Sequence, residues 1–149
     1  MFFLDKNEFC SVIKNSPLVS IDLVVKNSRG EILLGKRINR PAKGYWFVPG
    51  GRILKDESIS QAFSRITKIE LGVEISLERA NFLGPYEHFY TDNFFGDEFS
   101  THYVALGYEV ELNLTCEQLP EQQHDHYRWF TLKEILTATD IHKHSKWYV

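Results

Sequence analysis

Stretches of mostly apolar or alternating residues recur along the chain, and polar or glycine-containing breaks separate them. Such stretches are typical of β-strands. The expected strands cover residues 18–27, 31–37, 45–48, 81–90, 101–111 and 127–130. The sequence Asn27-Ser28-Arg29-Gly30, between the first two strands, predicts a hairpin turn. A polar loop at residues 117–125 is expected to precede the last strand.

A central helix is expected to begin at Asp56 or Ser58 and to end at Gly72, a residue type that commonly closes helices. Its apolar residues recur at helical spacing and form one stripe. That stripe consists of Ile59, Ala62, Phe63, Ile66 and Ile69. Glu70 falls near the middle of the stripe, although burial of an ionised carboxylate is costly and the helix dipole disfavours negative charge at this end. Two explanations remain open: the helix frays and Glu70 reaches water, or a cation holds the carboxylate.

Two further segments carry amphipathic or helical patterns. Residues 2–14 form an amphipathic segment, which the sequence Asn15-Ser16-Pro17 ends. Thr131, followed three residues later by Glu134, predicts the capped start of a late helix that runs through Ala138. Strands thus outnumber helices. The pattern predicts an α/β (α+β) fold in which helices sandwich a mixed sheet.

Composition narrows the class of protein. A length of 149 residues suggests a single domain, residues 1–149, with an N-terminal arm at about residues 1–16. The net charge of −3 provides no basic surface for nucleic acid. Cys10 and Cys116 are more typical of reduced thiols than of a disulfide in a chain of this length. With no signal-peptide pattern and no apolar run near the roughly 20 residues of a membrane span, we expect a cytoplasmic protein without a membrane partner.

The central stretch resembles the Nudix box, the signature G-x5-E-x7-R-E-U-x-E-E-x-G-U of the Nudix hydrolases, in which U is aliphatic. The matching residues are Gly51, Glu57, Arg65, Glu70, Gly72 and Val73. Ile66 and Ile69 stand at two glutamate positions, and Thr67 stands at an aliphatic one. In ordinary members of the family, those glutamates help to hold a cluster of divalent ions. Their loss argues against attack on phosphorus by several metal ions and leaves a site for one.

Sequence outside the box resembles one divergent branch of this family, the GDP-mannose mannosyl hydrolases. The shared motifs are PLVS at 17–20, NSRGE at 27–31, the segment 33–52, HFYTDNF at 88–94, THYV at 101–104 and the segment 121–129. This resemblance covers most of the chain and implies a Nudix-like α/β/α sandwich with a mixed β-sheet. It also implies a homodimer that hydrolyses GDP-mannose, or GDP-glucose, at sugar C1 to GDP and free sugar with inversion.

The resemblance further implies one Mg²⁺ per active site, with Mn²⁺ as an alternative. Glu70 would supply a carboxylate, Gly50 its backbone carbonyl and Gln123 a neutral side-chain oxygen. A small number of protein oxygen ligands, completed by substrate phosphates, is the arrangement that Mg²⁺ prefers. The two glycines at 50 and 51 would leave the backbone accessible to a ligand.

Basic and hydroxyl side chains supply the remaining chemistry that the family match implies. Arg37 and Arg52 suit forked, charge-assisted bonds to phosphate oxygens, although an arginine is usually solvated surface charge. Tyr103 would add a hydroxyl to a phosphate. His124 would be the general base that activates water on the sugar face opposite the diphosphate. His126 is the competing histidine, and a zinc site at this His-x-His pair lacks a third ligand at a recognisable spacing.

Two groups of residues match family positions around the sugar and the nucleotide. Asp22 and His88 would hold sugar hydroxyls or stabilise positive charge at C1, although Asp22 alone is equally consistent with a hydrogen-bonded core residue. Phe3, Leu4 and Phe9 match positions that contact the nucleotide. An ordinary hydrophobic arm packed on a neighbour is the alternative interpretation of these three residues.

Two other functions remain open at this point. A conventional Nudix enzyme would cleave the P–O–P linkage, against which Ile66 and Ile69 argue. A nucleotide-sugar binding protein without catalysis would be expected to lack the joint presence of Gln123, His124 and the two arginines. Product analysis separates the three, because they give GDP and mannose, GMP and mannose phosphate, or no turnover.

Overall fold

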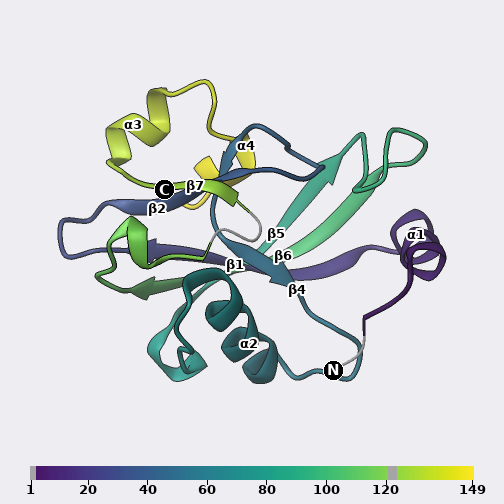
Figure 1. Ribbon diagram of the computed structural model, residues 1–149, viewed down its shortest axis with the longest axis horizontal. Coiled ribbons are helices and arrows are strands. Elements are labelled where there is room, and N and C mark those ends of the chain that lie inside the picture. Colours follow the sequence, from purple (N-terminus) through teal and green to yellow (C-terminus); the bar gives the residue numbers. More distant parts are fainter. Residues whose placement is uncertain (1–2, 121–123) are drawn as a thin grey trace.

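The computed structural model of the chain describes residues 3–120 and 124–149, and at residues 124 and 125 it describes the backbone only. Figure 1 shows strands running through the centre of the molecule with helices around them. The elements in chain order are α1 (Lys6–Asn15), β1 (Leu18–Lys26), β2 (Ile32–Arg37), β3 (Trp46–Phe47), β4 (Gly50–Arg52), α2 (Ile59–Leu71), η1 (Leu77–Arg79), β5 (Asn81–Tyr90), β6 (Thr101–Glu111), η2 (Cys116–Gln118), β7 (His124–Phe130), α3 (Leu132–Thr137) and α4 (Lys143–Lys146). None of the helices in the described ranges has the length and apolar character that crossing a bilayer requires.

The strands form a mixed sheet with the spatial order β3-β2-β1-β6-β5. β1 pairs in parallel with β6 along its whole length and antiparallel with β4 over residues 20–22. β2 meets β1 at the far end of that strand, where Lys26 pairs with Ile32, and its other partners are β3 and β7. β1 is therefore the strand from which the rest of the sheet is organised, and the predicted mixed sheet is confirmed.

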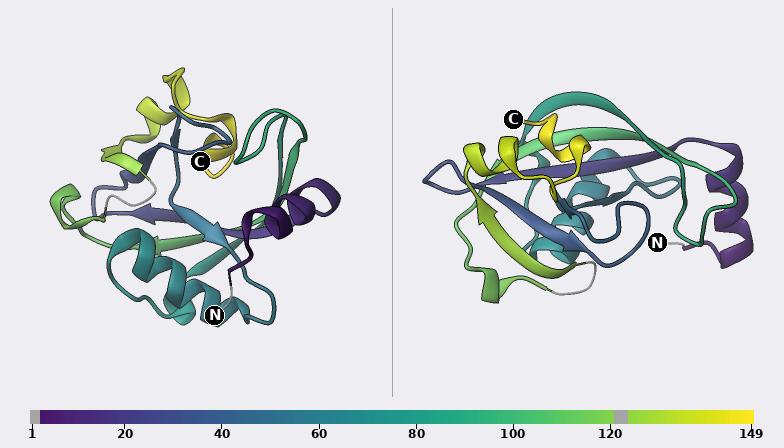
Figure 2. Two further views of the ribbon diagram at one scale, coloured as in Figure 1. Left: turned by 45° about the vertical axis from the view of Figure 1, so that its right-hand side comes forward. Right: turned by 90° about the horizontal axis from the view of Figure 1, so that it is seen from above.

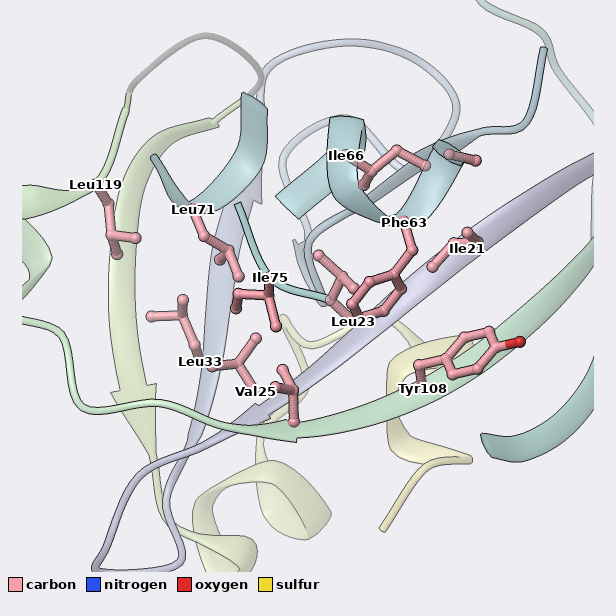
Figure 3. Packing of buried hydrophobic residues seen from close by; sticks show 12 residues of the cluster. Ile21, Leu23, Val25, Leu33, Phe63, Ile66, Leu71, Ile75, Tyr108 and Leu119 are labelled. Carbon is pink, nitrogen blue, oxygen red and sulfur yellow. The ribbon is translucent and has the colours of Figure 1, made fainter. Parts of the chain in front are cut away.

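Helices cover both faces of the sheet, with α2 on one face and α3 and α4 on the other (Figures 1 and 2). Side chains alternate along β1, so this strand contributes to two cores. Ile21, Leu23 and Val25 pack in the core beneath α2 (Figure 3), whereas Val24 belongs to the core on the opposite face. The predicted α/β/α sandwich is confirmed. The same alternation turns Asp22 toward the face that α3 and α4 cover.

The ends of α2 follow from local chemistry. Ser58 is the N-cap, and a capping box links its side chain and backbone with Gln61. Asp56, the other predicted start, has a left-handed backbone with φ of 66° and lies in the preceding turn. Gly72 closes the helix with φ of 76°, a conformation that glycine adopts without a Cβ penalty. The prediction for the helix is confirmed at both ends, with Ser58 as the cap.

Several local features differ from the sequence prediction. β4 occupies Gly50–Arg52, although the preceding strand was expected to end before the two glycines. Pairing with β1 holds this segment extended. β7 begins at His124 and not at Tyr127, since residues expected in a polar loop pair with β2. The helix α4 and the short turns η1 and η2 were not predicted. These elements depend on partners distant in sequence or are too short to leave a periodic pattern.

Candidate active site

The strand β4 turns part of its backbone away from the sheet. The N–H of Leu23 donates to the carbonyl of Pro49 at 2.8 Å, which sets the register of β4 on β1. Because backbone groups alternate in direction along a strand, those of Gly50 and Arg52 point away from β1. A side chain at Gly50 would collide, since an added Cβ would lie 2.3 Å from the carbonyl oxygen of Ile21. Glycine therefore permits β4 to lie close to β1 with its outer edge facing α2.

Two side chains of α2 contact this outer edge. The N–H of Gly50 donates to Oε1 of Glu70 at 3.2 Å, and the carbonyl of Arg52 accepts from Nη2 of Arg65 at 2.7 Å. Arg65 also forms a two-pronged ion pair with Glu57, with distances of 2.8 and 2.9 Å. Both side chains of that pair are 13% exposed, which places the charges out of most of the solvent. Residues of the Nudix box thus hold α2 and β4 at a set distance.

Glu70 is buried on the helix face that the sequence pattern indicated. α2 continues through it to Leu71, and Glu70 is 3% exposed. The explanation in which the helix frays and Glu70 reaches water is therefore wrong. The carboxylate lines a pocket that we call the Glu70 pocket. Its described lining residues are Phe3, Gly50, Gly51, Arg52, Leu54, Arg65, Ile66, Ile69 and Glu70. Among these residues Glu70 carries the one carboxylate, with Ile66 and Ile69 beside it.

On the other side of β4, a second pocket gathers side chains from several strands. Asp22, Arg37, Arg52, His88 and Tyr103 line it, one each from β1, β2, β4, β5 and β6. We call it the Asp22 pocket. The residues of β4 line both this pocket and the Glu70 pocket. A ligand that reached both would therefore pass along β4, with Arg52 lining both pockets and a buried carboxyl group in each.

The electrostatics of the Asp22 pocket are set by burial. Asp22 is 6% exposed, and desolvation raises its pKa to about 7, although the hydrogen bond from Tyr148 and the charge of Arg37 both oppose this rise. Nδ1 of His88 lies 3.8 Å from Oδ2 of Asp22. Burial lowers the pKa of His88 to about 4, so this imidazole is neutral near pH 7 and the contact is not an ion pair. The pocket thus holds a desolvated carboxyl group beside a neutral ring.

The predicted nucleotide-contacting residues are not gathered at one place. The guanidinium of Arg52 lies over the ring of Phe9, 4.4 Å from its centroid. Phe9 lines a groove with Arg37, Arg52 and Tyr103, whereas Phe3 lines the Glu70 pocket. Leu4 is half-buried and lines none of these three pockets. An aromatic surface beside the phosphate-binding candidates therefore comes from α1, through Phe9.

Gln123 lies outside the described residues, and so does the side chain of His124. The backbone of His124 is described: it pairs with Arg37 across the β2–β7 ladder, while His126 pairs with Lys36. The ladder shifts register at this point, which leaves one extra residue on β7 between the two histidines. The start of β7 is thus next to the end of β2, whose Arg37 lines the Asp22 pocket.

Sequence reasoning missed two residues at the Asp22 pocket. Tyr90 lines it, and the hydroxyl of Tyr148 donates to Oδ2 of Asp22 at 2.6 Å. Tyr148 could have been suspected from Gly107, because an isolated glycine inside a strand often marks the close approach of another group. An added Cβ at Gly107 would lie 2.7 Å from the ring of Tyr148.

Replacing His144 with glutamine should make the fold less sensitive to acid. His144 is 1% exposed, and burial, together with His88, His142 and Lys143, lowers its pKa from 6.5 to about 3. The unfolded chain therefore binds a proton below about pH 6.5 that the folded chain does not, so this residue costs stability as pH falls from that value. When the pH is lowered from 7 to 5, the unfolding free energy of His144→Gln should therefore fall by on the order of 1–2 kcal/mol less than that of the unmodified protein.

Urea unfolding at the two pH values measures this difference, and comparison of two proteins removes contributions that they share. One such contribution is that of Asp22, whose raised pKa acts in the opposite direction. His126→Gln, at an exposed position, is the matched control. Equal pH dependence in His144→Gln and the unmodified protein would show that the folded state accepts a proton at His144.

Comparison with known proteins identifies the family. A sequence model of the NUDIX domain matches residues 16–148. The chain belongs to the NUDIX family. A relative from Haloferax volcanii, the low-salt glycan biosynthesis protein Agl8, is 43% identical over 107 residues, which are 72% of this chain and 67% of the relative.

Solved structures agree with this assignment. The MutT NUDIX hydrolase from Burkholderia pseudomallei superimposes with a TM-score of 0.68 at 26% identity, over 89% of this chain and 95% of that one. The NUDIX domain of Shewanella oneidensis NrtR, solved in complex with ADP-ribose, gives a TM-score of 0.62 at 20% identity, over 93% and 90% of the two chains. The second likeness shows the fold alone. The family match and the first likeness place this NUDIX protein among the NUDIX hydrolases.

NUDIX hydrolases typically use divalent metal ions such as Mg²⁺. The donor set in this NUDIX protein fits a hard cation held by few protein ligands. Glu70 brings a buried carboxylate to the outer edge of β4, and the carbonyl of Gly50 points to that edge by the alternation described above. Among the described residues there is no group of three or more His, Cys, Asp or Glu side chains placed to bind a metal together. The described donors therefore suit a single cation that takes its other ligands from substrate and water.

Proposed function

We propose that this NUDIX protein hydrolyses GDP-mannose, or GDP-glucose, to GDP and free sugar by attack of water at sugar C1 with inversion. The observation that carries the proposal is the pairing of a one-carboxylate Glu70 pocket with a buried aspartate, Asp22, across β4. The first arrangement suits binding of a diphosphate through one cation. The second suits stabilisation of a cationic sugar. The name of the relative Agl8, a glycan biosynthesis protein, is consistent with a nucleotide sugar as substrate.

The diphosphate would lie along β4. Arg37 and Arg52 would bind its oxygens through charge-assisted hydrogen bonds, and the hydroxyl of Tyr103 would add another. These three side chains line the Asp22 pocket together. The positive charge of the two arginines, together with the hydrogen bond from Tyr103, would stabilise the negative charge that builds on departing GDP, so that no general acid is needed for this leaving group.

Glu70, the carbonyl of Gly50 and the side chain of Gln123 would hold Mg²⁺, with Mn²⁺ as the alternative. When bound, the cation would neutralise negative charge on the diphosphate. The side chain of Arg65, anchored by Glu57, would keep β4 and α2 in place while the ligand binds. With two isoleucines at glutamate positions of the Nudix box, the described residues favour one cation over a cluster.

The sugar would lie in the Asp22 pocket. The Asp22 carboxylate would stabilise positive charge at C1, and the neutral His88 ring would hold a sugar hydroxyl. His124 would act as the general base toward the attacking water, for which an imidazole has a suitable pKa. Phe3, Leu4 and Phe9 would contact the nucleotide, and a homodimer would allow the segment that carries them to serve the site of the second subunit.

Hydrolysis in ¹⁸O-labelled water is the test of the proposed function. With GDP-mannose and Mg²⁺, we expect the heavy oxygen in the released sugar and none in GDP, because water attacks carbon. Mass spectrometry of both products measures this. NMR recorded early in the reaction should show the anomer opposite to that in the substrate, before mutarotation mixes the two.

The competing functions predict different outcomes of the same experiment. Label in a phosphate, with GMP as product, would identify a conventional NUDIX pyrophosphatase. Binding without turnover across a panel of nucleotide sugars would identify a binding protein. Retention of anomeric configuration, with label in the sugar, would contradict the single-displacement geometry and would point to a covalent intermediate.

A further inference from the structure

Tyr148 contacts a predicted site residue from a distant part of the chain. Its hydroxyl donates to Oδ2 of Asp22 at 2.6 Å, across a separation of 126 residues. Burial and the neighbouring Asp22 carboxyl raise the pKa of Tyr148 above its usual value, so the hydroxyl keeps its proton and remains the donor. A charge-assisted bond of this length is strong and directional. It restrains the rotation of the Asp22 side chain.

The sheet is shaped to receive the ring of Tyr148. Gly107 on β6 lies directly beside Asp22 on β1 in the parallel ladder. An added Cβ at Gly107 would lie 2.7 Å from Cε1 of Tyr148 and 3.3 Å from the ring of Tyr86. The Tyr86 ring packs edge-on against that of Tyr148, with centroids 4.6 Å apart. The strand therefore leaves room for this aromatic side chain next to the carboxyl group that it binds.

The segment 140–148 is fastened to the sheet ahead of Tyr148. The backbone of Trp46 donates to the carbonyl of Asp140 at 2.9 Å and accepts from His142 at 3.0 Å. The N–H of Val48 donates to the hydroxyl of Ser145 at 3.0 Å, and Ser145 is buried. These bonds join the segment to the same stretch of chain that continues into β4. The position of Tyr148 is thus coupled to the wall of the Asp22 pocket.

We infer that Tyr148 is a positioning residue, which holds the carboxylate of Asp22 in the orientation that the reacting sugar requires. The inference rests on the proposed function and extends it to a residue outside the motifs in which the sequence resembles the GDP-mannose mannosyl hydrolases. Tyr148 need not touch the sugar for this role. It acts through Asp22. Because its hydrogen bond occupies Oδ2, Oδ1 is the oxygen of that carboxyl group that remains available for a ligand. An added Cβ at Gly50 would lie 2.9 Å from Oδ1, so this oxygen faces β4, the strand that lines both pockets.

Tyr148→Phe tests the inference, because it keeps the ring in place beside Gly107 and removes only the donated hydrogen bond. We expect kcat for GDP-mannose to fall by about 10- to 100-fold, with KM changed by less than about threefold. The affinity for GDP, measured by calorimetry, should stay within about twofold of that of the unmodified protein, since the groups proposed to bind the diphosphate are unchanged. Tyr86→Phe, which removes a hydroxyl from the neighbouring ring, is the matched control and should retain kcat within about twofold.

A double-mutant cycle with Asp22→Asn separates positioning from a structural role. If Tyr148 acts through Asp22, the Tyr148→Phe change should have almost no further effect on kcat once the carboxylate has been removed. An undiminished loss in that background, a parallel loss of GDP affinity, or unchanged kcat in the single variant would each overturn the inference. Failure of the proposed function would look different, because the unmodified protein itself would then place ¹⁸O in the nucleotide or show no turnover.

Discussion

Replacing His124 with glutamine should lower kcat by about 10²- to 10⁴-fold, the usual contribution of a general base. Glutamine retains hydrogen-bonding capacity and similar bulk but cannot accept a proton from water near neutral pH. The reason to expect the effect at this residue is positional: the backbone of His124 pairs with Arg37, whose side chain lines the Asp22 pocket. The acidic limb of the pH dependence of kcat/KM should be lost together with the rate, because that limb reports protonation of the base.

His126→Gln is the control for this experiment. His126 is exposed and pairs with Lys36, one position farther from the pocket along β2. We expect its kcat to stay within about threefold of that of the unmodified protein. Steady-state kinetics between pH 5 and pH 9 would compare the two variants. A large loss in His126→Gln with little loss in His124→Gln would transfer the role of base to His126, whereas small losses in both would leave this segment without a base.

Replacing Glu70 with glutamine should remove most of the activation by Mg²⁺, with turnover at a fixed metal concentration lowered by at least about 100-fold. The amide keeps the shape of the side chain, and its oxygen can still accept the hydrogen bond from the N–H of Gly50. It lacks the negative charge that a hard cation needs from its protein ligand. Glu70 is 3% exposed, and burial of an ionised carboxylate without its cation is costly. The neutral amide avoids that cost, so the fold should tolerate the change and the metal-free variant should be at least as stable as the metal-free parent.

Thermal unfolding with and without Mg²⁺ measures the two parts of this prediction separately. Binding of the ion to the folded state should raise the unfolding temperature of the unmodified protein, and the rise should be absent in Glu70→Gln. Glu74→Gln changes an exposed glutamate just beyond the helix and is the matched control. An equal thermal shift and an equal metal dependence of turnover in all three proteins would place the metal site elsewhere.

Local sequence patterns were sufficient for most of the elements. The mostly apolar run along β1, the capping signals at Thr131 and the closing glycine at residue 72 each predict structure within a few residues of themselves, so no distant partner is needed. The same patterns placed Glu70 on the buried face of α2, which is the position observed. A periodic pattern records which way a side chain points, and for a helix of 13 residues that information is reliable.

Only the tertiary structure decided how the site is assembled. In the sequence, the glycines at 50 and 51 suggest the end of a strand. Pairing with β1 nevertheless makes them part of a strand that lies between two pockets. Asp22 and Tyr148 are 126 residues apart, and nothing in the spacing of either predicts their hydrogen bond. Such contacts arise because segments far apart in sequence pack against one another in the folded chain. Local propensity carries no information about those neighbouring segments. A glycine inside a strand, such as Gly107, is a weak sequence signal of such a contact, because it leaves room for the approaching side chain.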